Sequence, residues 1–224
     1  MAQLEILPYL QRQGIQLEWL ILSHDDNDHS GGARAILSAY PDIQLTTASQ
    51  KRYGEKNTAK NDRTFCLAGK QWTWQGLRLT VLSPDNIVPR AENPDSCTLL
   101  LTDGKHNILL TGDADLSVEY NILPKLDKIH VLQVGHHGSK SSTGEALVRH
   151  IQPDIALISS SRWNPWHFPH QTVVDRLTRH HAQLYNTAED GQIRLLFEKN
   201  DIKIQTARAE FSPWYRRLIG LKGK

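Results

Sequence analysis

Short apolar runs alternate along the chain with stretches in which apolar residues recur at helical spacing. The runs predict buried strands, because a strand covered on both faces has few polar positions. Leu4, Leu7 and Leu10 follow helical spacing up to Gly14, which predicts a short helix before the first strand. The predicted strands cover residues 18–22, 43–46, 71–75, 77–82, 97–102, 107–111, 129–134 and 154–159, with more between 183 and 206, and further helices are predicted at 33–40, 116–123, 144–150 and 172–181. This alternation indicates an α/β layer arrangement.

Polar clusters follow three of the predicted strands. The first strand leads into the loop 23–32, a later strand ends at Asp113, and another leads into the loop 135–139, where two histidines lie between two glycines. In the first loop, five of the six residues from His24 to His29 can bind a metal. Its three carboxylates would repel one another without a cation, and its two imidazoles favour zinc, manganese or iron over calcium.

Each cluster also has an ordinary interpretation. The loop 23–32 could be a solvated acidic turn that caps the following helix, although this leaves its flanking histidines unexplained. The histidine pair of the loop 135–139 could be buried in the core, but the adjacent glycines leave little bulk to bury it. Because three separate strands end in metal-binding side chains, we favour a metal site.

The amino-acid composition excludes few classes of protein. The chain has 224 residues, a length that suits one domain with a sizeable core. Its 26 basic and 24 acidic residues give a net charge of +2, so nucleic-acid binding has to be argued from local patches. Cys66 and Cys97 lack a C-x-x-C spacing and say nothing firm about the redox compartment. No apolar stretch approaches the roughly 20 residues of a membrane helix, so we expect the chain by itself to be soluble and not inserted.

Two local patches could contact nucleic acid. The lysine- and arginine-rich stretch 49–63 is either a solvated surface loop or a basic rim that meets a phosphate backbone. Trp163 and Trp166 either form a wall on which a base or sugar stacks or pack across the domain. Trp72 and Trp74, by contrast, are expected to pack within a sheet.

The loop after the first strand reads H-x-D-x-D-H and resembles the H-x-H-x-D-H metal-binding signature of the metallo-β-lactamase superfamily, with Asp26 in place of the second histidine. Three further motifs, in the same order, are similar to those of the C-terminal hydrolase-like domain of the ComEC family of competence proteins. They are L-T-G-D-A-D at 110–115, V-G-H-H-G-S at 134–139 and W-N-P-W-H-F-P-H at 163–170. The resemblance implies an α/β (α+β) fold, the αββα metallo-β-lactamase sandwich.

The sequence departs from these families in several places. The strands that usually precede the first helix are absent, so we expect an N-terminally truncated domain over 1–206, followed by a basic tail over 207–224. No histidine stands near Asn93, where most members of the superfamily have a further metal ligand, and Phe168 stands where ComEC relatives often have a histidine. Together with Asp26, the missing histidine favours a hard ion such as manganese at one metal position.

The resemblance implies two divalent metal ions, manganese or zinc. Their implied ligands are His24, Asp26, Asp28, His29, Asp113 and His137, with Asp113 shared between the two ions. The residues alone do not decide whether His136 or His137 is the ligand. The implied catalytic residues are Asp28, His136 and His170, and the implied substrate-binding residues are Ser139, Lys140, Asn164 and His167.

Two metal ions that share one carboxylate suit the hydrolysis of a phosphodiester bond. We therefore expect a metal-dependent phosphodiesterase or nuclease that acts on DNA during uptake. The alternatives are a hydrolase of small phosphoesters or lactones and an inactive fragment with a binding role. The ComEC resemblance also implies a membrane channel domain of the same or a parent polypeptide as partner, and association with the inner membrane on a side that stays open.

Overall fold

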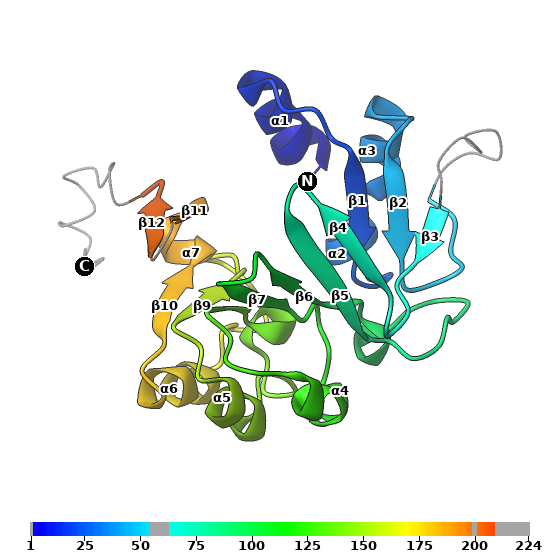
Figure 1. Cartoon of the computed structure of the whole chain (residues 1–224). Helices are drawn as coiled ribbons and strands as arrows, with labels where there is room; N and C mark the ends of the chain where they lie inside the picture. Colours follow the sequence, from blue (N-terminus) through cyan, green and yellow to red (C-terminus); the bar gives the residue numbers. More distant parts are fainter. Residues whose placement is uncertain (1, 54–62, 199–200, 209–224) are drawn as a thin grey trace.

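Two β-sheets lie between two groups of helices (Figure 1). The structure, a computed structural model, describes residues 2–53, 63–198 and 201–208. Lys56 and Lys60 of the basic stretch, and the tail from residue 209 onward, lie outside the described residues. This helix–sheet–sheet–helix order is the αββα arrangement that the resemblance implied.

The smaller sheet is parallel and has the order β1–β2–β3. Its strands are β1 (Trp19–Leu22), β2 (Gln44–Thr47) and β3 (Arg63–Phe65), and its helices are η1 (Ala2–Ile6), α1 (Leu7–Gln13), α2 (Asn27–Ser30) and α3 (Ala33–Ala39). Ile36 and Leu37 of α3 pack with Leu22 and Leu45 of the strands in one buried cluster. Strand β3 was not predicted, because the polar stretch before it has no apolar pattern.

The larger sheet has seven strands in the order β10–β9–β8–β7–β6–β5–β4. Its strands are β4 (Gln71–Trp74), β5 (Leu77–Ser83), β6 (Thr98–Thr102), β7 (Asn107–Leu110), β8 (Val131–Gln133), β9 (Ile155–Ile158) and β10 (Gln183–Asn186). Strands β4 to β7 pair antiparallel, whereas β7 to β10 pair parallel. A separate antiparallel pair consists of β11 (Ile193–Phe197) and β12 (Ile202–Thr206).

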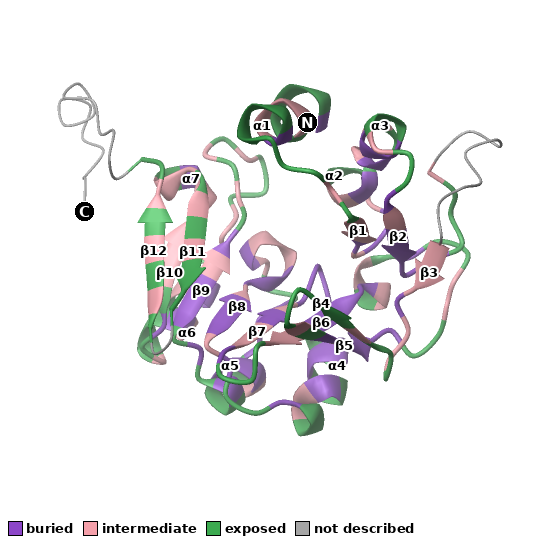
Figure 2. Ribbon diagram, turned by 45° about the horizontal axis from the view of Figure 1, so that its top comes forward, coloured by how far each residue is buried: buried purple, intermediate pink, exposed green. Residues whose placement is uncertain are grey.

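Helices connect the parallel strands and cover the outer face of the larger sheet (Figure 1). They are α4 (Leu116–Ile122), α5 (Glu145–Ile151) and α6 (Gln171–Arg179), with short turns η2 (Asn93–Asp95), η3 (Leu123–Lys125), η4 (Gly135–Gly138) and α7 (Thr187–Asp190). Leu132, Leu147 and Leu177 are fully buried between these helices and the sheet, where Figure 2 shows the buried residues concentrated. Among the described residues, no helix has the length and apolar character needed to cross a bilayer.

The parallel connections bring several strand ends to one edge. A crossover helix returns the chain to the start of the next parallel strand, so β7, β8 and β9 all end at the same side of the sheet. Two predicted helix boundaries are confirmed. Asp115 caps α4 by accepting hydrogen bonds from the backbone N–H groups of Ser117 and Val118, and Gly14 ends α1 with φ 62°.

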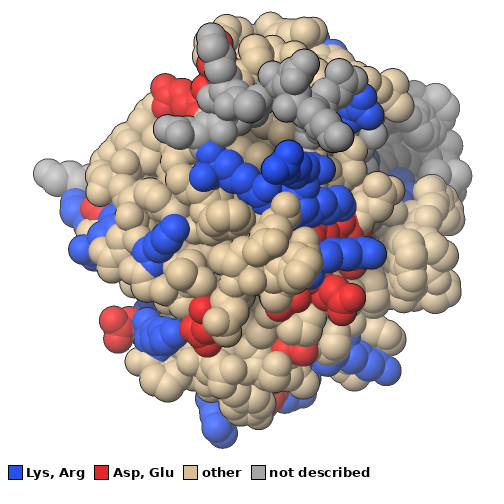
Figure 3. All heavy atoms as spheres, turned by 90° about the vertical axis from the view of Figure 1, so that its right-hand side faces the viewer, with Lys and Arg blue, Asp and Glu red and all other residues tan. Residues whose placement is uncertain are grey.

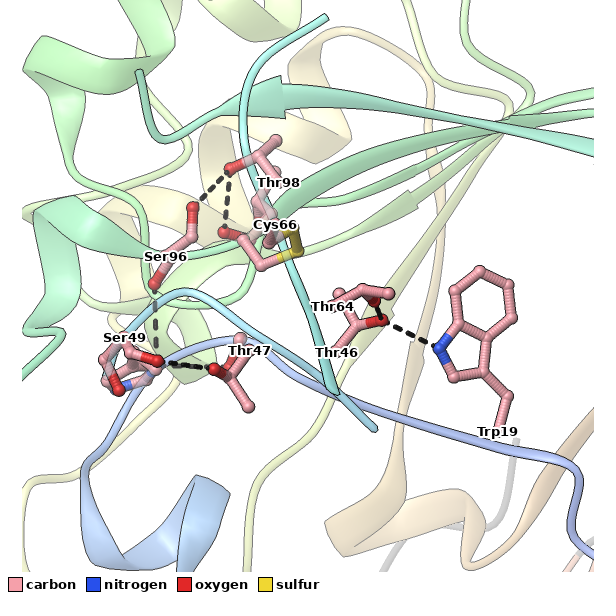
Figure 4. The surroundings of a disulfide bond; sticks show 12 residues. Trp19, Thr46, Thr47, Ser49, Thr64, Cys66, Ser96 and Thr98 are labelled. Atoms are coloured by element: carbon pink, nitrogen blue, oxygen red, sulfur yellow. Dashed lines mark hydrogen bonds between the residues drawn. A yellow bond between two sulfur atoms is a disulfide. The ribbon is translucent and has the colours of Figure 1, made fainter. Parts of the chain in front are cut away.

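Cys66 and Cys97 form a disulfide that joins the two sheets (Figure 4). Cys66 follows β3 and Cys97 precedes β6, and both are buried. The sequence separation of 31 residues gave no sign of this pair.

Trp72 adds an edge-on contact with Trp19 across the sheets, at a ring distance of 5.2 Å, so its expected packing is confirmed. Trp74 is 40% exposed instead.

Candidate metal centre

The three carboxylates of the loop after β1 have different surroundings. Asp25 turns away from the other acidic residues and is buried, with Oδ2 accepting from the backbone N–H of Ala91 at 2.7 Å. Its Oδ1 accepts from the hydroxyls of Ser49 and Tyr53. These hydrogen bonds lower the pKa of Asp25 although burial alone would raise it. Asp25 therefore fixes the loop.

His24 and His29 both direct Nε2 toward Asp113. The Ser23 hydroxyl lies 3.1 Å from Nδ1 of His24 and 3.0 Å from Nδ1 of His29, so one side chain orients both rings. Nε2 of His29 lies 3.2 Å from Oδ1 of Asp113, and Nε2 of His24 lies 4.0 Å from Oδ2. The Ser96 hydroxyl accepts from the backbone N–H of Asp113, which follows β7.

The two histidines after β8 occupy different positions. Both have left-handed backbone conformations, with φ 47° at His136 and 54° at His137, a strained state that is common at functional sites. Nε2 of His137 lies 3.2 Å from Nε2 of His29 and 3.3 Å from Oδ2 of Asp28. Its Nδ1 lies 2.7 Å from the carbonyl of Ser159 and donates to it, which leaves the Nε2 lone pair free for a metal.

His136 lies at the margin of this cluster. Its Nε2 is 3.8 Å from Oδ2 of Asp113, and its Nδ1 is 3.1 Å from the Ser141 hydroxyl. The His136 ring also contacts the Phe168 ring, at a ring distance of 5.8 Å. The side chain is 25% exposed, so it can meet a bound molecule.

Two groups of side chains fit divalent ions. The ligand atoms of His24, His29 and Asp113 lie within 4.8 Å of one another, and so do those of Asp28, His29 and His137. Among the described residues, Nε2 of His24 is buried and has no hydrogen-bond partner. Imidazole nitrogens and carboxylate oxygens that converge in this way suit a cation such as zinc or manganese. The two groups have His29 in common, whereas the resemblance implied Asp113 as the ligand shared between two ions.

Protonation follows from these contacts. Burial and the nearby His29 lower the pKa of His24, which favours the neutral form that binds metals. Burial alone would lower the pKa of His29, but the hydrogen bond and charge of Asp113 raise it. Burial alone would likewise raise the pKa of Asp113, and the hydrogen bond and charge of His29 lower it.

Asp26 lies beside the two ligand groups and belongs to neither. Its Oδ2 is 3.7 Å from Nε2 of His24, and its Oδ1 is 3.6 Å from Nη2 of Arg90. Asn93, near the position of the absent histidine, has a buried Oδ1 for which the described residues offer no hydrogen-bond partner.

The other predicted residues lie in the loops around the centre. The Asn164 side chain bonds to the backbone of Ser161 and Phe168 and so fixes its own loop. His170 precedes α6, and its backbone N–H donates to the carbonyl of Gly138. The Ser139 hydroxyl lies 3.0 Å from that of Ser141, and the side chains of Lys140 and His167 are exposed.

Sequence reasoning missed the residues that support the centre from distant segments. Ser96 contacts the centre through Asp113 and lies 3.5 Å from Nδ1 of His24, 72 residues away. Ser159 orients His137 only through its backbone carbonyl. A single hydroxyl or carbonyl carries no local pattern, so no sequence signal could have identified these contacts.

Comparison with known proteins agrees with this geometry. A family model described as the metallo-beta-lactamase superfamily matches residues 1–162. Recombination protein 2 of Haemophilus influenzae is 58% identical over 221 residues, which cover 99% of this chain and 27% of that protein. Competence protein ComA of Neisseria gonorrhoeae is 28% identical over 221 residues, 96% of this chain and 30% of that protein.

A solved structure shows the same fold without showing the reaction. CmlA, a diiron β-hydroxylase from Streptomyces venezuelae, superimposes with a TM-score of 0.53 at 8% identity, over 75% of this chain and 43% of that chain. The chain spans less than a third of the length of the two curated relatives, so their whole activities do not transfer directly. Since the family model covers most of the chain and the fold agrees with it, the chain belongs to the metallo-beta-lactamase superfamily and is related to competence proteins.

Proposed function

We propose that this chain is a metal-dependent phosphodiesterase that cleaves DNA. The observation that carries the proposal is the convergence of two overlapping ligand groups, each with three ligand atoms within 4.8 Å. The Nε2 atom of His29 has one lone pair and can bind one ion, so a second ion would be held by the remaining ligands of its group. Two divalent ions, manganese or zinc, would supply Lewis acidity to a phosphodiester and to the attacking water. The ligand residues would be those that the sequence predicted, with Asp26 at the margin beside Arg90.

The residues around the ligand groups suit the remaining steps. His136 is partly exposed and has Nδ1 against the Ser141 hydroxyl, so its Nε2 can give a proton to the leaving oxygen. Asp28, the most exposed of the candidate carboxylates, can orient a water, since 64% of its side chain is accessible. Ser139 and Lys140, in the same loop, can donate to a phosphate oxygen, and His167 and His170 would lie farther along the substrate.

The relatives support the biological setting of this proposal. One carries competence in its name and another recombination, both of which involve DNA. We propose that residues 1–206 form the hydrolase domain, that its partner is a membrane channel domain of the same or a parent polypeptide, and that it works at the inner membrane.

Cleavage of DNA tests the proposal. Plasmid and single-stranded oligonucleotide are incubated with Mn²⁺ or Zn²⁺, and product is followed on gels. We expect cleavage that a chelator abolishes, and a loss of at least roughly a hundredfold in the Asp113→Asn variant, since the variant loses the carboxylate charge beside His24 and His29. Equal rates in wild type and variant would rule out a metal-dependent reaction at this centre.

A small-substrate hydrolase is the alternative, and the same preparations separate the two functions. Chromogenic phosphoesters and lactones are offered under the same metal conditions. Turnover of these compounds without DNA cleavage would select the alternative. Neither activity, with less than one ion bound per folded chain, would select a binding role.

A further inference from the structure

An open hollow of about 560 Å³ adjoins the loop 23–32, and four of the nine described residues that line it are cationic. Arg34 of α3, Lys51 and Arg52 of the segment after β2, and Arg90 before η2 all reach it, so three separate segments contribute. On the face shown in Figure 3, Lys and Arg side chains gather across the middle. Among the described residues that line the hollow, the one carboxylate is that of Asp25, which accepts hydrogen bonds from Ser49, Tyr53 and Ala91. The hollow is therefore suited to an anion.

An aromatic shelf lies beside His136, at the margin of the centre. We define it as Trp166 and Phe168, whose rings are stacked at 6.5 Å with an interplanar angle of 16°. Trp166 is 68% exposed, so the alternative of packing across the domain is wrong for this side chain. An exposed indole that continues a stack of rings offers a surface for one further flat ring.

A row of contacts connects the shelf with the hollow through the candidate metal centre. Phe168 meets the His136 ring at 5.8 Å, and His136 lies 3.8 Å from Asp113. His24 lies 4.0 Å from Asp113, and Asp26 lies 3.7 Å from His24. Asp26 then lies 3.6 Å from Arg90, which lines the hollow. The centre thus lies between a surface for phosphates and a surface for a base.

We propose that single-stranded DNA crosses the metal centre on this track, with its phosphates in the basic hollow and an unpaired base stacked on Trp166. This inference deepens the proposed function and rests on it. Paired bases in a duplex already stack on their neighbours and do not offer a free face to a side chain, whereas unpaired bases do. The cations of the hollow add affinity without reading sequence.

Binding in the presence of a chelator tests the track without any cleavage. A fluorescein-labelled single-stranded oligonucleotide and its duplex are titrated with the full chain, and anisotropy is recorded over a range of salt concentrations. The Arg34→Ala/Arg52→Ala variant is compared with Lys128→Ala/Arg149→Ala. This control pair also removes two positive charges, from exposed residues that lie before β8 and on α5.

We expect the Arg34→Ala/Arg52→Ala variant to lose roughly tenfold in affinity. The slope of the logarithm of its binding constant against the logarithm of the salt concentration should become shallower by about 1.4, because two phosphate contacts are lost. The control variant should bind as wild type does. Trp166→Ala should lose roughly tenfold for the single strand and little for the duplex, and Trp166→Phe should retain most of the affinity. Equal binding by the two double variants, or unchanged single-strand binding by Trp166→Ala, would overturn the track.

A parallel cleavage assay with Mn²⁺ keeps the two proposals apart. If wild type cleaves DNA while the hollow and shelf variants bind normally, the track is wrong and the proposed function stands. If these variants lose binding as expected while wild type cleaves nothing, the track stands as a binding surface and the nuclease proposal fails.

Discussion

His29 is the residue on which the two ligand groups depend. Its Nε2 lies 3.2 Å from both Oδ1 of Asp113 and Nε2 of His137, and its Nδ1 is fixed by Ser23. Without an ion, a proton on Nε2 can serve only one of these two neighbours at a time. A divalent cation satisfies several lone pairs at once, which explains why so many acceptor atoms converge here.

The adjacent His136 and His137 should have separable roles. His137→Ala removes a ligand from the group with Asp28, so we expect the variant to hold fewer Mn²⁺ ions per chain than wild type. His136→Ala leaves both ligand groups intact, so we expect full metal content and cleavage slower by roughly a hundredfold. Elemental analysis after dialysis and single-turnover rates measure the two effects. Metal loss in His136→Ala with normal content in His137→Ala would reverse the assignment.

Glu119 of α4 should make stability depend on pH. Burial raises the pKa of its carboxyl to about 7, although it accepts hydrogen bonds from the backbone N–H groups of Thr143 and Gly144. A raised carboxyl pKa means that the folded state holds the proton more tightly than the unfolded chain does. Its contribution to stability is therefore greatest below about pH 4.5 and falls as the pH rises to about 7.

Urea unfolding at pH 5 and pH 8 measures this effect. In wild type, Glu119 should lower the free energy of unfolding by about 2 to 3 kcal/mol between these two pH values. Glu119→Gln does not ionise, so the difference between the two pH values should shrink by that amount, while the other titrating groups contribute equally to both proteins. An identical pH dependence in the two proteins would contradict the prediction.

For single residues, the sequence predicted which side chains could bind a metal better than it predicted where those side chains point. His24, Asp28, Asp113 and His137 follow strand ends, and the structure brings them together as that position predicted. Asp25 lies in the same motif but turns toward Ala91, 66 residues away. No local pattern distinguishes a carboxylate that faces the centre from one that holds the loop, because the partner comes from a distant segment.

At the scale of elements, the C-terminal ends of strands supply the site. β1 leads into the loop 23–32, β7 into Asp113, β8 into the histidine pair, and β9 into Ser159. Hydrophobic runs predicted these strands because both of their faces are covered. The runs carry no information on which sheet a strand joins, so the separation into sheets of three and seven strands did not follow from the sequence.

The disulfide that joins β3 to β6 should contribute strongly to stability. Cys66 and Cys97 are buried, and the crosslink closes a loop with a sequence separation of 31 residues. In the chain-entropy model, a loop of that length adds about 3 to 4 kcal/mol. We expect Cys66→Ala/Cys97→Ala to lower the free energy of unfolding by about that amount.

Urea unfolding with and without a reducing agent provides the control for this disulfide. Reduced wild type should unfold at about the same urea concentration as the double variant. The reductant should not change the stability of the variant. Because Cys97 is next to Ser96, which contacts the centre, metal content is measured in parallel. Equal stability of oxidised wild type and variant would show that the disulfide is absent or contributes nothing.

At the scale of the whole molecule, the centre is shared by the two sheets. His24, Asp28 and His29 follow β1 of the smaller sheet, whereas Asp113 and His137 follow strands of the larger sheet. Each ligand group contains residues from both sheets. A bound ion would therefore connect the two sheets at the site, in addition to the disulfide and the contact between Trp19 and Trp72.

Metal binding should consequently stabilise the whole fold. A ligand that binds only the folded state at a hundred times its dissociation constant adds about 2.7 kcal/mol, which for a domain of this size corresponds to a rise of roughly 5 to 10 °C in Tm. We expect Mn²⁺ to raise the Tm of wild type by this amount, and a chelator to reverse the rise. In Asp113→Asn and His137→Ala, each of which removes a ligand that connects one sheet to the other, the rise should be much smaller. Differential scanning calorimetry of the three proteins with and without Mn²⁺ measures it. An equal rise in all three would mean that the ion binds elsewhere, and that the converging histidines and carboxylates do not hold it.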